Sequence, residues 1–246
     1  MEKIVSEWIR SYCIDNNIKT LVVGISGGID SALVSTLCCM TGIRTVVVSL
    51  PIHQNISQLK RAHLHSEWLK NKFDNVEFME IDLTLLFDTF KELFPDSDNL
   101  SLANSRSRLR MTSLYQISAS NSGIVVGTGN KIEDFGIGFF TKYGDGGVDI
   151  SPIADFTKSE VRSMSKNIGI IEEILIAPPT DGLWDDNRTD EQQIGCSYQD
   201  LEWAMDYNQN PKDLDEHQKN ILNIYNSFHN RNKHKMSPIP VFIRKK

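Results

Sequence analysis

The sequence predicts an α/β fold, with a doubly wound, mainly parallel sheet that carries helices on both faces. Short β-branched runs alternate with helix-length stretches, a pattern typical of parallel strands joined by right-handed crossovers. The strand-like runs are continuously apolar, which indicates a sheet covered on both sides. The composition is that of a globular domain, with 40% apolar, 24% charged and 9% aromatic residues.

The alternating segments can be placed in chain order. We expect strands at Thr20–Ile25, Thr45–Leu50, Val76–Ile81 and Gly123–Thr128. We expect helices at Ser31–Met40, Ser57–Lys72, Leu83–Phe94 and Ser105–Asn121. Helix-length stretches thus lie between the strands, as expected of parallel strands joined by crossovers.

The alternation of strand-like and helix-like segments ends after residue 128. Glycines and aromatic residues crowd into Gly136–Gly147, which is more typical of a functional loop than of a linker. The pattern Thr157-x-x-Glu160 is a capping box and predicts a helix start.

The C-terminal part is expected to be helical over about 189–235, within a single domain that spans 1–246. A second long loop, Ala177–Arg188, precedes a helix that begins near Thr189. A last helix is predicted at about Asp213–Asn230, followed by a basic tail, Arg231–Lys246.

Charge and apolar content exclude several classes of protein. The formal net charge is −6, from 26 basic and 32 acidic residues, which argues against a general nucleic-acid binder. No apolar run approaches the ~20 residues that span a bilayer. The N-terminus lacks the layout of a signal peptide. The four cysteines form no C-x-x-C pair and fit a reducing cytoplasm.

The sharpest motif lies between the first strand and its helix. It reads Gly24-Ile25-Ser26-Gly27-Gly28-Ile29-Asp30-Ser31. A glycine-rich turn at a strand's carboxyl end that opens a helix favours an anion such as phosphate. Asp30 would repel phosphate unless a cation lies between them, so a hard cation such as Mg²⁺ is implied.

Three further segments add charged and polar side chains. Gly127-Thr128 is followed by Glu133 after another strand, so Asp30 and Glu133 could hold the same cation. The segment Asn104-x-Arg106-x-Arg108-x-Arg110-Met111 places Arg106 and Arg110 on one helical face and Arg108 on another. Phe140-Thr141-Lys142-Tyr143-Gly144-Asp145-Gly146-Gly147-Val148-Asp149 supplies a lysine, aromatic surface and acids.

Together these motifs resemble the NAD synthetase family, part of the ATP pyrophosphatase superfamily, over nearly the whole chain. The resemblance implies a ligase that joins ammonia to nicotinic acid adenine dinucleotide (deamido-NAD), the last step of NAD biosynthesis. ATP and Mg²⁺ are used, an acyl adenylate forms, and AMP and pyrophosphate leave. It also implies a homodimer that binds the dinucleotide across its interface.

The resemblance assigns roles residue by residue. ATP contacts fall on Gly24, Ile25, Ser26, Gly27, Gly28, Ile29, Asp30, Ser31, Thr128, Lys158 and Thr180. Metal carboxylates fall on Asp30 and Glu133. Contacts to deamido-NAD fall on Arg108, Lys142, Asp149, His234 and Lys235. The segment Ala177–Trp184 and the spacing between Glu133 and Lys142 depart from the commoner family pattern.

Three of these residues are expected to be catalytic. Asp30 holds the metal, and Lys158 adds a second cation at the phosphates. Ammonium must lose a proton before it can attack, and Asp149 is the expected acceptor, with Asp145 as the nearby alternative. The stretch before the first strand is too short for an amidase domain, so free ammonia is the expected nitrogen donor.

Other functions remain as alternatives. One is a different ATP-pyrophosphatase-type ligase that adenylates another acceptor, including tRNA-modifying, guanine-pathway and arginine-pathway enzymes. The absence of C-x-x-C and the acidic balance argue against the tRNA-modifying class. A non-enzymatic nucleotide sensor would explain the phosphate loop but not the paired carboxylates and the lysines.

Overall fold

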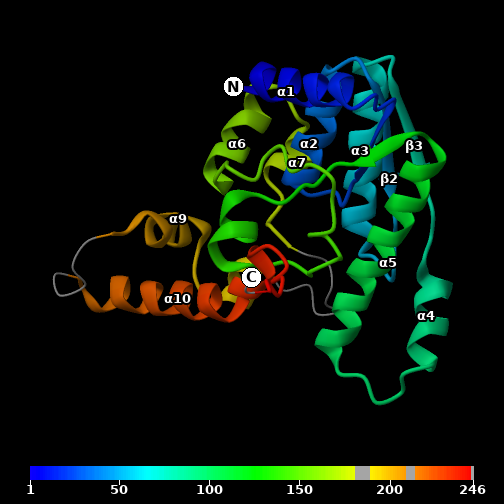
Figure 1. Cartoon of the computed structure of the whole chain (residues 1–246). Helices are drawn as coiled ribbons and strands as arrows, with labels where there is room; N and C mark the ends of the chain where they lie inside the picture. Colours follow the sequence, from blue (N-terminus) through cyan, green and yellow to red (C-terminus); the bar gives the residue numbers. More distant parts are fainter. Residues whose placement is uncertain (181–188, 209–213, 245–246) are drawn as a thin grey trace.

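Four parallel strands form the centre of the fold in the order β3-β2-β1-β4 (Figure 1). The computed structural model describes residues 1–180, 189–208 and 214–244. The strands are β1 (Thr20–Gly24), β2 (Arg44–Ser49), β3 (Val76–Glu80) and β4 (Gly123–Val125). Val22 pairs with both Val46 and Val125, so β1 is central. A parallel bridge between Val126 and Ile150 continues the sheet beyond β4.

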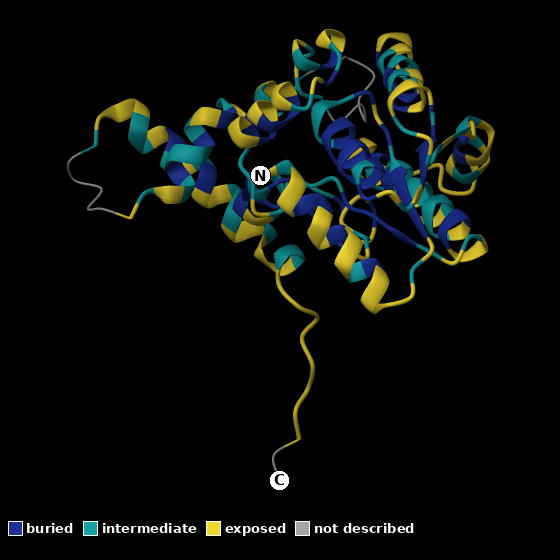
Figure 2. Ribbon diagram, turned by 90° about the horizontal axis from the view of Figure 1, so that it is seen from above, coloured by how far each residue is buried: buried dark blue, intermediate teal, exposed yellow. Residues whose placement is uncertain are grey.

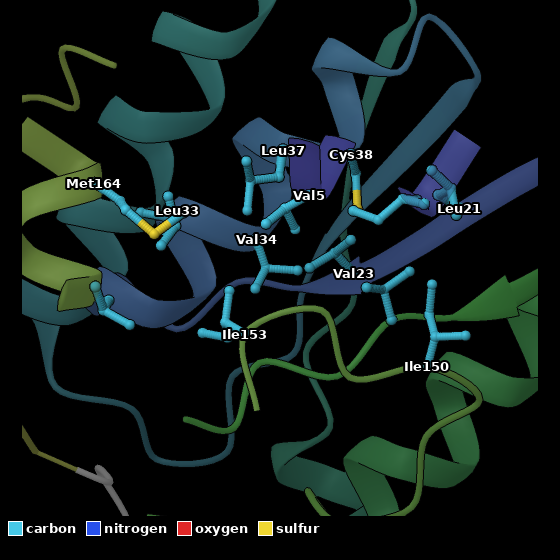
Figure 3. Close-up of a cluster of buried hydrophobic side chains, with 14 of the residues drawn as sticks. Val5, Leu21, Val23, Leu33, Val34, Leu37, Cys38, Ile150, Ile153 and Met164 are labelled. Carbon is cyan, nitrogen blue, oxygen red and sulfur yellow. The ribbon is translucent and has the colours of Figure 1, made fainter. Parts of the chain in front are cut away.

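Helices cover both faces, as predicted. The helices that cover the sheet and flank it are α1 (Glu2–Asp15), α2 (Ile29–Met40), α3 (Ile56–Lys72), α4 (Thr84–Glu92), α5 (Asn99–Ser120), α6 (Lys158–Asn167) and α7 (Glu172–Leu175). Leu21 and Val23 face the core under α1, α2 and α6, which Figure 3 shows. Val22 faces the opposite side, where α4 and α5 pack. Alternate residues of one strand therefore serve two apolar cores, which is why the strand sequence is continuously apolar.

The C-terminal helices form a separate cluster beside the sheet (Figures 1 and 2). They are α8 (Asp190–Ile194), α9 (Tyr198–Asp206) and α10 (Glu216–Met236), and they pack on the π-helix η1 (Ile132–Ile137). His229 and Asn232 of α10 bond to the carbonyls of Gly136 and Ile137, at 2.7 and 2.8 Å. Residues 237–244 leave α10 as an exposed extended tail (Figure 2). The single-domain assignment over 1–246 stays a prediction.

Several predicted boundaries are wrong. Helix α5 begins six residues earlier than expected, because Asp98 caps it by accepting from Ser101 N at 2.8 Å. Strand β4 ends at Val125 instead of Thr128, although Val126 still donates to Val22 O at 2.9 Å. By contrast, the helix expected to begin near Thr189 does so, with Thr189 as its N-cap, and the left-handed Gly195 ends it after one short stretch.

Three more elements differ from expectation. Helix α1 was not anticipated, and α10 continues to Met236 instead of ending at Asn230. The expected glycine-rich loop begins as the π-helix η1. Parts of two predicted segments, 181–188 of the second loop and 213 of the last helix, lie outside the described residues. Across those described residues, no helix is long and apolar enough to cross a membrane.

Candidate active site

A cavity of about 290 Å³ opens at the carboxyl ends of β1, β2 and β4. This is the edge where ligands of parallel α/β sheets bind. Most of the side chains and backbone groups predicted for ATP and metal line it, including Thr128, Glu133, Lys158 and Thr180. Of the predicted phosphate loop, Gly27 alone does not line the cavity.

The phosphate loop is shaped by its glycines and serines. Gly27 has a φ of 80°, and a Cβ there would overlap the Gln58 carbonyl oxygen of α3. Ser31 Oγ donates to Gly28 O at 3.1 Å and accepts from Ser26 N at 3.2 Å. Arg61 Nε donates to Gly27 O at 3.0 Å. Hydrogen bonds from Ser31 within the loop and from Arg61 of α3 therefore fix the conformation of the turn.

Helix α2 starts directly after this turn with no side-chain cap. Its N-cap is Gly28, which has no side chain to accept from the first amides. The first N–H groups of a helix lack internal partners, and the helix dipole is positive at that end. The loop thus presents amide donors to an anion, as the sequence predicted for phosphate.

Two carboxylates meet one buried ammonium at the cavity wall. Lys158 Nζ lies 2.5 Å from Asp30 Oδ2 and 2.9 Å from Glu133 Oε1. The side chain of Lys158 is only 4% exposed. Asn130 Nδ2 donates to Asp30 Oδ1 at 3.0 Å, and Tyr198 OH donates to Glu133 Oε1 at 2.5 Å. Residues 128 positions apart in sequence are therefore joined in one charged cluster.

Burial and mutual charge shift the pKa values of this cluster. Burial disfavours the Lys158 ammonium, but the two carboxylates outweigh it and raise the pKa of Lys158. Burial raises the pKa of Asp30 more than the nearby ammonium lowers it. Burial also opposes ionisation of Glu133, but Lys158 and the Tyr198 hydroxyl outweigh it and lower the pKa of Glu133.

The two carboxylates are suited to a hard divalent cation. Their lysine-facing oxygens are at most about 5.4 Å apart, the total of the distances 2.5 and 2.9 Å. Within the described parts of the chain, no group of three or more His, Cys, Asp and Glu side chains gathers as a metal cage. Mg²⁺ commonly binds through one or two carboxylates, with phosphates and water as its other ligands. Asp30 and Glu133 fit that pattern, and metal binding stays a prediction.

Four of the five residues predicted for deamido-NAD gather around the end of α10. Both Nε and Nη2 of Arg108 lie 3.4 Å from Lys142 O. Lys142 Nζ donates to His234 O at 3.1 Å, and Lys235 Nζ donates to Phe140 O at 2.7 Å. His234 and Lys235 belong to the last turn of α10 rather than to a tail. We call these four side chains the basic cluster.

Asp149 lies elsewhere. Its carboxylate accepts from Val125 N at 2.7 Å and from Tyr115 OH at 3.1 Å, and it does not line the cavity. Asp145 does line it, and accepts from Ser107 Oγ at 2.6 Å and Thr141 N at 2.9 Å. Burial raises the pKa of Asp145 despite these bonds. Of the two acids considered for the proton, Asp145 is the one on the cavity wall.

Two arginines from the Asn104–Met111 segment and one tyrosine complete the description of the site. Arg110 lines the cavity and donates to Leu50 O and Gln54 Oε1, both at 2.9 Å. Arg106 instead lies 4.8 Å above the Phe87 ring. Tyr198 was missed because nothing in the sequence connects it to Glu133. Its only sequence cue is the capping box that starts at Ser197.

Known proteins with similar sequences show to which family this chain belongs. A family model described as NAD synthase matches residues 1–238. The chain belongs to the NAD synthase family. An "NH(3)-dependent NAD(+) synthetase" from Methanococcoides burtonii is 38% identical over 206 residues, covering 82% of this chain and 76% of that protein. The relative of the same name from Carboxydothermus hydrogenoformans is 37% identical, covering 82% of each chain.

Solved structures of NAD synthase relatives share the fold. The NMN synthetase of Francisella tularensis has a TM-score of 0.87 and 29% identity, covering 98% of this chain and 96% of its own. The NH3-dependent NAD synthetase of Campylobacter jejuni has a TM-score of 0.80 at 23% identity, covering 98% and 97%. The latter supports the fold alone. The predicted doubly wound parallel architecture is therefore confirmed.

Proposed function

We propose that this NAD synthase family member amidates deamido-NAD with ammonia, consuming ATP and releasing AMP and pyrophosphate. The observation that carries the proposal is that the phosphate loop, which includes Asp30, lines one cavity together with Lys158 and Glu133. A phosphate loop alone would serve any nucleotide binder. Carboxylates and a buried ammonium beside it supply what cleavage between two phosphates needs, charge neutralisation at a polyanion.

The loop and Lys158 bind the phosphates of ATP in this proposal. The backbone N–H groups at the start of α2 donate to the phosphate oxygens, and Lys158 adds a fixed positive charge beside them. Asp30 and Glu133 would hold Mg²⁺, which when bound neutralises the departing pyrophosphate. Thr128 and Thr180 line the same cavity and would contact ATP.

The acceptor carboxylate attacks the α-phosphate of ATP. A new carbonyl-oxygen–phosphorus bond forms, the bond to the β-phosphate breaks, and pyrophosphate leaves. The acyl adenylate is then an electrophile with AMP as its leaving group, which the free carboxylate lacks. The basic cluster of Arg108, Lys142, His234 and Lys235 would bind the phosphates of the dinucleotide.

Ammonia attacks that intermediate, so ammonium must first lose a proton. Asp149 was the expected acceptor, and that role stays a prediction. Its two hydrogen bonds and its position off the cavity wall favour a structural role, whereas Asp145 lies on the wall. We therefore expect Asp145→Asn to lower kcat more than Asp149→Asn at saturating ammonium. If Asp149→Asn lowers kcat more than Asp145→Asn, Asp149 is the proton acceptor.

A smaller acceptor is the second candidate. The structure named NMN synthetase matches 98% of this chain at a TM-score of 0.87, so nicotinate mononucleotide belongs in the test. Competition between the two acceptors at equal concentration measures the ratio of their kcat/KM values. A ratio above one for the dinucleotide supports the main proposal, and a ratio below one supports the mononucleotide.

We also propose that the protein acts as a homodimer in the cytoplasm. Exposed apolar side chains on α4, just after it and at the start of α5 support the first point. They are Leu85, Leu86, Leu93, Phe94 and Leu100. All four cysteines are unpaired thiols, which supports a reducing compartment.

One assay tests the reaction. Purified protein is mixed with ATP, Mg²⁺, ammonium and deamido-NAD, and products are followed by mass spectrometry. Equal amounts of NAD and AMP are expected. AMP without NAD would support a ligase with another acceptor, and ATP binding without AMP would support a nucleotide sensor. Replacing ammonium by glutamine should abolish turnover if free ammonia is the donor.

A further inference from the structure

Two consecutive acids of the π-helix η1 have different surroundings. Glu133 is bonded to Lys158 and Tyr198, as described above. Asp134 points instead toward Gly129, in the turn that follows β4, and both Asp134 and Gly129 line the nucleotide cavity. π-Helical turns often occur at functional sites, because they change which side chains reach a given face.

The Asp134 carboxylate occupies space that is free only because residue 129 is glycine. A Cβ built on Gly129 would overlap Cγ and both oxygens of the Asp134 carboxylate. Gly129 does not have a positive φ, so its backbone does not require glycine. The requirement is one of space, since the carboxylate occupies the position that a side chain at 129 would fill.

The Asp134 carboxylate has no protein partner among residues 1–180, 189–208 and 214–244. It accepts no hydrogen bond there and forms no ion pair. The neighbouring acids differ, because Asp30 and Glu133 share Lys158, and Asp145 is bonded to Ser107 and Thr141. Burial and the surrounding acids raise the pKa of Asp134 well above its ordinary value. The opposing attraction from Lys235 is weak, and that ammonium is bonded to Phe140 O at 2.7 Å.

A largely enclosed, unpaired carboxylate is costly unless a cation joins it. One unshared carboxylate matches the single charge of ammonium and can accept from its N–H groups. A divalent cation would be better served by the paired carboxylates of Asp30 and Glu133. The cavity must also admit the nitrogen nucleophile beside the adenylated carboxyl group.

We propose that Asp134, placed by the gap at Gly129, is the carboxylate that binds substrate ammonium in the cavity. This inference rests on the proposed amidation. Asp134 holds the cation by charge, and removal of the proton is left to another group.

Two variants disturb the site in different ways. Asp134→Asn removes the carboxyl group that ammonium would pair with and keeps the shape, whereas Gly129→Ala keeps that carboxyl group and displaces it. Both should raise the KM for ammonium by about tenfold or more, the effect of losing one close charge interaction. The KM values for ATP, Mg²⁺ and dinucleotide should stay within about twofold. Asp155→Asn is the matched control, since Asp155 is an acid with a 95% exposed side chain that does not line this cavity.

Two further readouts separate this inference from the proposed function. Exchange of labelled pyrophosphate into ATP needs the acceptor but no ammonium, so both variants should retain it. Hydroxylamine is largely uncharged at neutral pH and gives a hydroxamate, so its KM should change much less than that of ammonium. The double variant Gly129→Asp with Asp134→Gly returns a carboxylate to the same space and should recover low KM for ammonium.

Several outcomes would overturn the proposal. One is an unchanged ammonium KM in both variants. Others are a shift in the KM for Mg²⁺, loss of pyrophosphate exchange, or an equal loss with hydroxylamine. If the wild-type protein shows no exchange and no NAD, the proposed function fails first. If Asp134→Asn does not fold, Gly129→Ala and the double variant still decide the question.

Discussion

Replacing Lys158 with methionine is expected to destabilise the protein strongly. The change removes the only cation bonded to both Asp30 and Glu133 in the described structure and leaves two buried carboxylates facing each other. Their facing oxygens are at most about 5.4 Å apart, the total of 2.5 and 2.9 Å. With an effective dielectric constant of about 20, their repulsion is at least about 3 kcal/mol.

That magnitude agrees with the loss of about 3–5 kcal/mol found when one partner of a buried ion pair is removed. For a chain of this size, 3 kcal/mol corresponds to a fall in Tm of about 6–12 °C. Thermal unfolding followed by circular dichroism at neutral pH measures it. Lys166→Met is the matched control, since Lys166 is exposed on the same helix, α6.

A second substitution tests the cause of the loss. Adding Asp30→Asn to Lys158→Met removes one of the two repelling charges, so the double variant should be more stable than the single variant. Divalent cations should also raise the Tm of Lys158→Met more than that of the wild type, if Asp30 and Glu133 bind metal. A Tm within about 2 °C of the control, or a double variant less stable than the single one, would refute the reasoning.

Three further outcomes are expected. Burial lowers the pKa of His65 to about 4, whereas the unfolded value is about 6.5, so the unfolded state binds more protons and stability falls as pH drops from about 6.5 to 4. His65→Phe should remove up to about 3 kcal/mol of that decline in urea titrations at several pH values, and an unchanged slope would contradict it. Gly27→Ala should weaken ATP binding by about tenfold or more in calorimetry, because the loop cannot keep its turn against Gln58 O, and unaltered affinity would count against that role of the loop. Leu85→Lys should shift sedimentation toward the monomer if α4 lies in the dimer interface, and an unchanged profile would remove that helix from it.

The local patterns of the sequence were enough for most of the sheet. The β-branched runs predict β1, β2 and β3 to within one residue at either end, because buried parallel strands are apolar on both faces. The glycine-rich turn and the helix that follows it are present as predicted, since glycine spacing and a following helix are local features. The capping box at Thr157 is present, and both its bonds form within three residues.

Local sequence patterns could not predict helix ends or side-chain partners that depend on residues far away in the chain. Helix α10 extends to Met236 because its side chains bond to Gly136 and Ile137 of η1, far away in sequence. The same long-range packing carries His234 and Lys235 to the basic cluster.

The sequence by itself determined the α/β class, the anion-binding turn and the resemblance to NAD synthetases, because each follows from residues close together in the chain. Only the tertiary structure decided which charges meet. It set Lys158 between Asp30 and Glu133, bonded Asp149 to the strand and helix beside it, and left Asp134 facing the cavity across Gly129. The physical reason is that a charge's effect depends on distance and burial, which are properties of the folded chain.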